Sequence, residues 1–455
     1  MSTDALKFKR FTIQSNDNGK TCDVRAGTPV IEYRESVFMP YPTVECAIVD
    51  TGNALQDEDG DLVSVLEGVK CQGVDKVEFE IEDSNGNALK WYGDNHLVIS
   101  KTSAINSSFK AQTFMLSLVT PEAFDNLRID NECRGGYRGR ISDIVKEICL
   151  RNLKTNKKTI NFDETIEVFS QEGKSRKPFD MILDLQPVAI PDSVQTDDGK
   201  SAKGNLAGYL FWQTTEGFCF KSLDKLFKST GTFPNYLDDR GRRIKKVIET
   251  KRGDDVIPPG YDDKILNYKT HRTFDGLTQF EYGAYNSLQE TFDLFEGEYT
   301  VGREALEQLQ SYSKVLGGKD LPDFGYFNDV PTMRGFATKA KGLVSLYGES
   351  VDSQVDGLDV ERYSVDDVFQ QSSQNYKQKM NMSAEIIIPA DFSLHAGDLI
   401  YCEFQKLSSA KTVKRSTNRD SGIYMIADLC HYGNKSKTFT GLHLVRDSYG
   451  VKSNG

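Results

Sequence analysis

Short stretches of alternating apolar and polar residues occupy both ends of this chain of 455 residues. In the first third, the alternation covers residues 29–50, 77–82, 96–100 and 110–119. Turns rich in glycine and asparagine separate these stretches, as in the segment SNGN at 84–87. A period of two indicates strands with one buried face, and several short strands at this spacing are typical of a sandwich or a barrel.

The segment at about 380–450 shows the same alternation. It predicts four more strands, within SAEIIIPA, GDLIYCEF, GIYMIADLCHYG and KTFTGLHLVRDS. A polar loop at 405–420 lies between the second and third of them. Strands at both ends of the chain therefore indicate two barrels with insertions between them.

Helical periodicity begins near residue 120. Pro121 opens a short helix, because proline fits the first helical turn. Apolar residues then recur at helical spacing within 139–153, where Ser142 is the expected N-cap. A third helix is expected to begin at Pro178 and to end before Pro187.

The next segment predicts a β-hairpin over 207–220, and Ser222 is expected to cap the helical turn that follows it. Beyond residue 300 the chain is helical and rich in loops, with helices predicted over 336–350 and 364–380. Together these patterns predict an α+β fold dominated by β-structure, with two antiparallel β-barrels.

The predicted domains follow from this order. The first barrel takes residues 1–120 and about 207–260, and the α/β module takes 121–206. The second barrel takes 261–300 and 380–450. The remaining residues, 301–379, form a helical and loop-rich peripheral block.

The composition of the chain excludes several classes of protein. The chain has 67 acidic and 56 basic residues and a net charge of −11, which argues against a general nucleic-acid binder. A basic run at 240–252 carries a net charge of +6, but it lacks the interleaved aromatic residues of a single-strand binding site. We expect no secretory signal and no transmembrane segment, since no apolar stretch is long enough. Eight cysteines without a CxxC pair predict free thiols in a reducing compartment.

Motifs for catalysis are incomplete. Gly19-Lys20-Thr21 resembles the end of a phosphate loop, but Gln14 stands where that loop needs glycine. Ser222 and Lys225 fit an SxxK pattern without its partner motifs, so a helix cap explains Ser222 better. With 67 acidic residues a carboxylate pair for glycoside hydrolysis stays open, although nothing singles one out.

Two candidate metal sites are also weak. The acidic segment 57–61 does not match the spacing of an EF-hand loop, so a solvated turn is the favoured interpretation and an irregular calcium site the alternative. Cys402, Cys430, His431 and His443 lie on neighbouring predicted strands and could meet around zinc. However, Cys430 and His431 are adjacent in one strand and point to opposite faces. The sequence therefore predicts no catalytic, cofactor-binding or metal-binding residues.

The order of segments resembles the baseplate hub proteins of contractile-tailed, T-even-like bacteriophages. More distantly, it resembles the hub part of type VI secretion spike proteins. Four stretches carry this resemblance: TVECAIVDTGNAL, GRISDIVKEICLRNL with KPFDMILDL, GYLFWQTTEGFCFKSLDKL, and GDLIYCEF with SGIYMIADLCHYGNKSKTFTGLHLVRDSYG. They cover about residues 40–450, whereas 301–376 and the loop at 405–420 match no part of the family pattern.

The resemblance implies a structural, non-enzymatic virion protein without a cofactor. Such hubs are homotrimers in which two barrels per subunit form a pseudo-six-fold ring. That ring joins the six-fold tail tube to the three-fold central spike, contacts other baseplate subunits and leaves a channel through which DNA passes. The protein would be made in the host cytoplasm and assembled into the tail baseplate.

Two other functions stay open. A tail-associated cell-wall hydrolase would need an isolated acid in an apolar setting, and 301–376 is the segment that could supply it. A receptor-binding tail protein would usually show repeats or a fibrous stem, and the sequence has neither.

Overall fold

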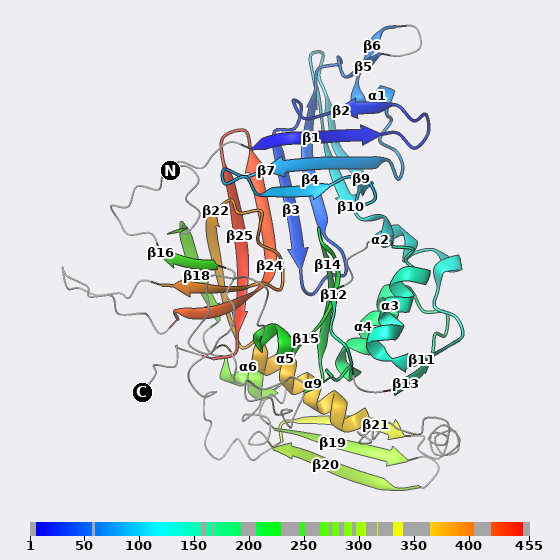
Figure 1. Ribbon diagram of the computed structural model, residues 1–455, viewed down its shortest axis with the longest axis vertical. Coiled ribbons are helices and arrows are strands. Elements are labelled where there is room, and N and C mark those ends of the chain that lie inside the picture. Colours follow the sequence, from blue (N-terminus) through cyan, green and yellow to red (C-terminus); the bar gives the residue numbers. More distant parts are fainter. Residues whose placement is uncertain are drawn as a thin grey trace, which may run out of the picture.

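A computed structural model describes most of the chain (Figure 1). It describes residues 6–56, 60–155, 161–165, 168–192, 206–228, 246–250, 264–272, 275–281, 286–293, 297–305, 316, 331–339, 365–404 and 420–448. The fold is dominated by β-structure, as predicted. Fifteen strands belong to one sheet, which is antiparallel except where β16 pairs with β17 and β23.

The N-terminal strands form one half of this sheet. They are β1 (Lys7–Gln14), β2 (Thr21–Asp23), β3 (Val30–Ser36), β4 (Thr43–Asp50), β7 (Lys76–Glu82), β8 (Ala88–Trp91), β9 (Leu97–Ser107) and β10 (Gln112–Val119). Their pairing order is β3-β4-β10-β9-β7-β1-β2, with β8 on β7. Each of the four alternating stretches predicted in this part of the sequence contributes at least one strand. A two-stranded ribbon, β5 (Leu55–Gln56) and β6 (Leu62–Val63), and the short helix α1 (Val65–Gly68) extend from it.

The second half contains β16 (Lys246–Thr250), β17 (Lys264–Ile265), β18 (Asn267–Arg272), β22 (Met382–Pro389), β23 (Leu399–Glu403), β24 (Gly422–Asn434) and β25 (Thr438–Arg446). The last four are the strands predicted for the end of the chain. From β24 the pairings run on one side through β25 and β22 to β18, and on the other side through β23 and β16 to β17. Leu266 lies between β17 and β18 in the chain.

Strand β24 belongs to both halves. Its residues 422–425 pair with β23, and its residues 428–434 pair with β3, while β25 lies along its other edge. The N–H of Leu6, just before β1, donates to the carbonyl oxygen of Asn434 at the end of β24 (3.2 Å). The N-terminal half therefore contacts β24 at this hydrogen bond as well as along β3. Inward side chains of both halves, such as Phe79 and Ile386, form one continuous core.

A helical module with its own core flanks the sheet (Figure 1). It contains α2 (Pro121–Asp125), the 3-10 turn Ile129–Asn131, β11 (Gly136–Arg140), α3 (Ile141–Arg151), β12 (Asn161–Phe162), β13 (Val168–Glu172), α4 (Pro178–Leu185), the 3-10 turn Gln186–Val188, β14 (Tyr209–Thr214) and β15 (Gly217–Ser222). The three helices and the hairpin are where the sequence predicts them. The predicted cap is wrong: Arg140 is the N-cap of α3, and Ser142 lies inside it, because the Ser142 side chain bonds to Thr165 instead.

The remaining elements lie below the sheet in Figure 1. They are α5 (Leu223–Lys228), α6 (Gly276–Glu281), β19 (Asn286–Asp293), β20 (Tyr299–Ala305), β21 (Met333–Lys339) and α9 (Val365–Lys379). Helix α9 confirms the helix predicted over 364–380. The helix predicted over 336–350 is wrong in its first residues, because β21 pairs there with β19; the rest lies outside the described residues. None of the helices in the described ranges has both the length and the apolar character needed to cross a membrane.

Candidate functional site

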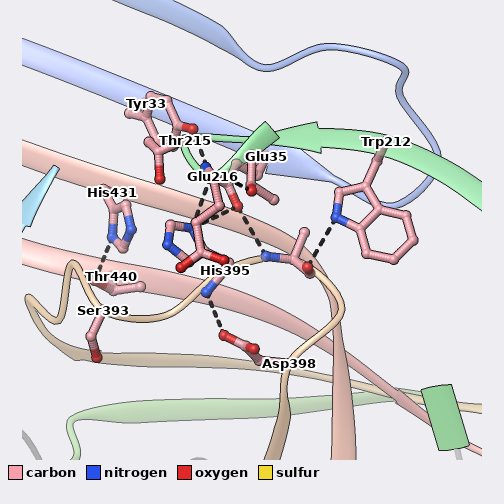
Figure 2. Close-up of polar contacts among 12 residues, drawn as sticks. Tyr33, Glu35, Trp212, Thr215, Glu216, Ser393, His395, Asp398, His431 and Thr440 are labelled. Carbon is pink, nitrogen blue, oxygen red and sulfur yellow. Dashed lines mark hydrogen bonds and ion pairs between the residues drawn. The ribbon is translucent and has the colours of Figure 1, made fainter. Parts of the chain in front are cut away.

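A buried polar cluster lies where β24 changes its partner from β23 to β3 (Figure 2). At its centre is Glu35 of β3, whose side chain is 0% exposed. The Glu35 carboxylate accepts hydrogen bonds from the hydroxyl of Tyr33 (2.6 Å) and from the backbone N–H of Ala396 (3.0 Å). The Nδ1 atom of His395 lies 3.0 and 3.2 Å from the two carboxylate oxygens. Glu35 therefore joins β3 to the segment between β22 and β23.

The surroundings keep Glu35 ionised. Burial by itself raises the pKa of a carboxyl group, because it removes the charged form from water. In Glu35 the positive charge of His395 and the hydrogen bonds from Tyr33 and Ala396 outweigh burial, so the pKa of Glu35 is lowered. Glu35 is thus a buried carboxylate surrounded by His395 and hydrogen-bond donors, the arrangement that a buried charge requires.

The segment that carries His395 is held from a second side. The indole Nε1 of Trp212, on β14, donates to the carbonyl oxygen of Ala396 (3.1 Å). Gly397 then turns with φ of +91°, and a Cβ atom there would lie 2.6 Å from the Trp212 ring. The next residue, Asp398, accepts from the N–H of His395 (2.7 Å). Gly397 and Asp398 are the first two residues of the GDLIYCEF stretch. They therefore hold the segment that carries His395 in place beside Glu35.

His431 of β24 is a further buried member of this polar cluster. It is buried, its Nδ1 lies 2.9 Å from the hydroxyl oxygen of Thr440, and its ring stacks on Tyr33. Burial lowers the pKa of His431 to about 4, and the nearby His395 adds to this. His431 is therefore neutral at pH 7, unlike an imidazole that acts as a general acid.

A second carboxylate–imidazole pair lies on the opposite face of the same strands. Asp428 of β24 accepts a hydrogen bond from the hydroxyl of Ser36 and lies 2.7 Å from Nδ1 of His443. Serine, histidine and aspartate are the residues of a hydrolase triad, but their order here is different. Asp428 lies between the other two, so among the described residues no imidazole contacts the Ser36 hydroxyl to remove its proton.

Sequence reasoning missed both pairs. The outer pair has a local signal, because Asp428 and His443 face each other across the β24–β25 hairpin. The inner pair has none, since Glu35 and His395 are 360 residues apart.

The RDS segment of the last stretch is a further structural joint. Arg446 is fully buried and donates to the carbonyl oxygens of Asp420 (3.4 Å) and Ser421 (3.2 Å). Its guanidinium lies 4.8 Å from the centre of the Tyr424 ring. A Cβ atom at Gly422 would lie 2.6 Å from that guanidinium, so this position favours glycine. Arg446 thereby fixes the beginning of β24.

A third buried charge fixes α9. The Nζ of Lys379 lies 3.3 Å from Asp224 of α5, and both side chains are almost completely buried. Asp224 also accepts from the N–H of Leu206 (2.9 Å), and Lys379 lies over the Phe227 ring. The end of α9 is therefore anchored to the hairpin and helix that follow the α/β module.

The structure also places the other sequence candidates. Gly19 and Lys20 lie in the tight turn between β1 and β2, where the N–H of Gly19 bonds to the carbonyl oxygen of Ser15. The Ser222 hydroxyl accepts from the N–H of Lys225 (3.4 Å), which supports its predicted role as a cap. Most of the acidic segment 57–61 lies outside the described residues.

The zinc candidates are separated. Cys402 and His431 point into the core, whereas Cys430 and His443 lie on the outer face. This confirms that Cys430 and His431 point in opposite directions. In the part of the chain that the structure describes, no group of three or more histidine, cysteine, aspartate or glutamate side chains could hold a metal ion. All eight cysteines are free thiols.

No protein-family model matches the sequence, and no curated protein matches it. Among solved structures, the chain is similar to a tail protein from Neisseria meningitidis MC58 (9% identity, 97% of each chain covered, TM-score 0.48). It is similar to the 43 kDa tail protein of prophage MuSo2 from Shewanella oneidensis (9% identity, 96% of this chain and 98% of that chain, TM-score 0.48). A third is the E. coli c3393 protein, described as a type VI secretion component similar to the T4 tail proteins gp27 and gp5 (9% identity, 98% and 79% covered, TM-score 0.42).

These neighbours are phage tail proteins and a type VI secretion component, which are the classes that the sequence resemblance predicts.

Proposed function

We propose that this chain is a structural, non-enzymatic subunit of a phage tail baseplate hub. Three copies form a ring with pseudo-six-fold symmetry, which joins the six-fold tail tube to the three-fold central spike. The ring leaves a channel through which DNA passes transiently. The tube protein, the spike protein and other baseplate subunits are its partners, and the virion tail is its location.

The observation that carries this proposal is that two runs of paired strands share β24 and one core, and we infer that each run closes into a barrel. A closed circuit of strands with inward apolar side chains is the arrangement of a β-barrel. Two barrels in each of three subunits supply six positions around an axis, which is how a trimer can match a six-fold partner. We assign the first barrel to the N-terminal strands and the second to β16–β18 and β22–β25, with helices α2–α4 and strands β19–β21 outside them.

The contacts of the buried charged side chains favour a structural role for this protein. Glu35, Lys379 and Arg446 are all engaged in contacts that join separate segments of the chain. A catalytic acid would instead face a cavity that admits substrate. For these three residues, this supports the hub over the cell-wall hydrolase. The carboxylates that do line a groove, Asp428 and Glu385, contact His443 and His271.

The net charge of −11 fits a channel protein, since an acidic lumen repels the phosphate backbone and limits adhesion during passage. The charge supports the proposal without identifying the residues that line the channel.

The test is the native mass of the purified chain by light scattering, with negative-stain images of the same fraction. A mass near 153 kDa, three times 51.1 kDa, with ring-shaped particles supports the proposal. A species of 51.1 kDa that stays monomeric as the concentration rises contradicts the trimer. If that monomer also cleaves peptidoglycan in a zymogram, the hydrolase replaces the hub.

A further inference from the structure

The long hairpin of β9 and β10 ends in an exposed, cationic tip. Phe109, in its turn, is completely exposed, with a relative accessibility of 104%, and Ile105 on the same hairpin is 56% exposed. Lys110 follows Phe109 in the turn, and the sequence KTSAINSSFKAQ at 101–112 contains no acidic residue. An apolar side chain with an adjacent lysine on a projecting hairpin is suited to inserting into an apolar recess with an acidic rim.

Such a recess lies on the outer face of the sheet that joins the two halves. A groove of about 430 Å³ crosses β3, β24, β25 and β22. Gly441 stands in register between Cys430 and Ile387, so the face lacks a side chain at its middle. Met39 and Tyr41 line the groove beside β3. A cavity of about 150 Å³ suffices for a benzene ring, so this groove has room for a phenylalanine side chain and part of its turn.

The rim of this groove is acidic. Asp428 and Glu385 line it on either side of His443, and both carboxylates are partly exposed. Asp428 contacts His443 (2.7 Å), and Glu385 contacts His271 (2.8 Å) and stands opposite Lys269 in the β18–β22 register. Arg34, which also lines the groove, is paired with Glu32 (2.7 Å). The tip and the groove are therefore complementary in both charge and polarity.

We propose that the β9–β10 tip of one subunit docks in this groove of a neighbouring copy, with Phe109 inside and Lys110 beside Asp428 and Glu385. This inference rests on the proposed trimeric hub and identifies one of its subunit contacts. Because the tip and the groove are different surfaces, the contact is head-to-tail and can close into a ring.

Cys430 lines the groove and is half-buried, so it can form a disulfide with a cysteine that docks there. Cys219 is also half-buried but does not line the groove, and the other cysteines are buried. A Phe109→Cys variant of the full chain is oxidised with copper phenanthroline and analysed on non-reducing gels. We expect disulfide-linked ladders up to the trimer, and their loss in the Phe109→Cys/Cys430→Ser double variant. Tyr92→Cys, at another exposed aromatic residue, is the matched control and should form no ladder.

Light scattering on the same samples separates the two proposals. A trimer in which Phe109→Cys forms no Cys430-dependent link overturns the docking contact and leaves the hub intact. A monomer overturns the trimer and, with it, the contact. Links that persist in the double variant, or that form only to a different protein, show another occupant and also overturn the contact.

A charge swap tests the rim independently. Lys110→Glu should weaken trimer formation by roughly tenfold or more, because it places like charges against Asp428 and Glu385. Adding Glu385→Lys should restore most of the loss, whereas Lys90→Glu, on β8, should change little. Equal effects of Lys110→Glu and Lys90→Glu, or no rescue by the second change, contradict the docking.

Discussion

The two faces of one strand junction hold the same chemical pair in different surroundings. On the inner face Glu35 pairs with His395, and their side chains are 0% and 13% exposed. On the outer face Asp428 pairs with His443, and their side chains are 43% and 33% exposed. In both pairs the imidazole Nδ1 contacts a carboxylate. We therefore expect burial, more than the identity of the pair, to decide how much such a contact stabilises the fold.

The largest expected effect comes from breaking the inner pair. Glu35→Gln leaves His395 buried without its counter-charge, which should lower the unfolding free energy by about 3–5 kcal/mol. Urea unfolding of the purified variant measures this loss. A double-mutant cycle with His395→Gln tests whether the loss is shared; a loss below that of Asp428→Asn would contradict the comparison.

The second effect is the pH dependence on the inner face, which is spread over a range of pH. The pKa of His431 is lowered to about 4 from 6.5, so between these values the unfolded chain binds a proton that the folded chain does not. The unfolding free energy should therefore fall by about 1.4 kcal/mol for each pH unit as the pH drops through this window, and level off below it. Thermal unfolding from pH 7 to pH 4 measures the slope, and His431→Gln should flatten it. The same slope in the variant would assign the effect to another group.

The smallest effect should come from the outer pair. Asp428→Asn removes a carboxylate that is partly exposed, where solvent screens its charge, so the unfolding free energy should change by about 0–1 kcal/mol. Urea unfolding at low and high salt checks this, since the difference should shrink as salt rises. A loss as large as that of Glu35→Gln would mean that the outer pair is as important to stability as the inner one.

Local patterns predicted local structure well. Alternation located the strands at both ends of the chain, and the hairpin spacing located Tyr209–Ser222. Adjacent placement in one strand was enough to separate Cys430 from His431. These features depend on residues that are close in the sequence.

What the sequence could not predict depends on distant residues. The pairing of β24 with β3 and the contact of Glu35 with His395 join segments hundreds of residues apart, and no periodicity encodes such a register. Strand β21 was misassigned because its residues, such as Ala337 and Lys339, favour helices; pairing with β19 overrode that preference.

The sharing of β24 also sets the order in which the chain can fold during synthesis. The N-terminal strands leave the ribosome first, but the edge of β3 stays unpaired until residues 428–434 have emerged. An unpaired strand edge is prone to association with other chains. The first half of the protein thus reaches its final form only when the last strands are made, so a nascent chain that stops before β24 exposes a strand edge that the finished protein never shows.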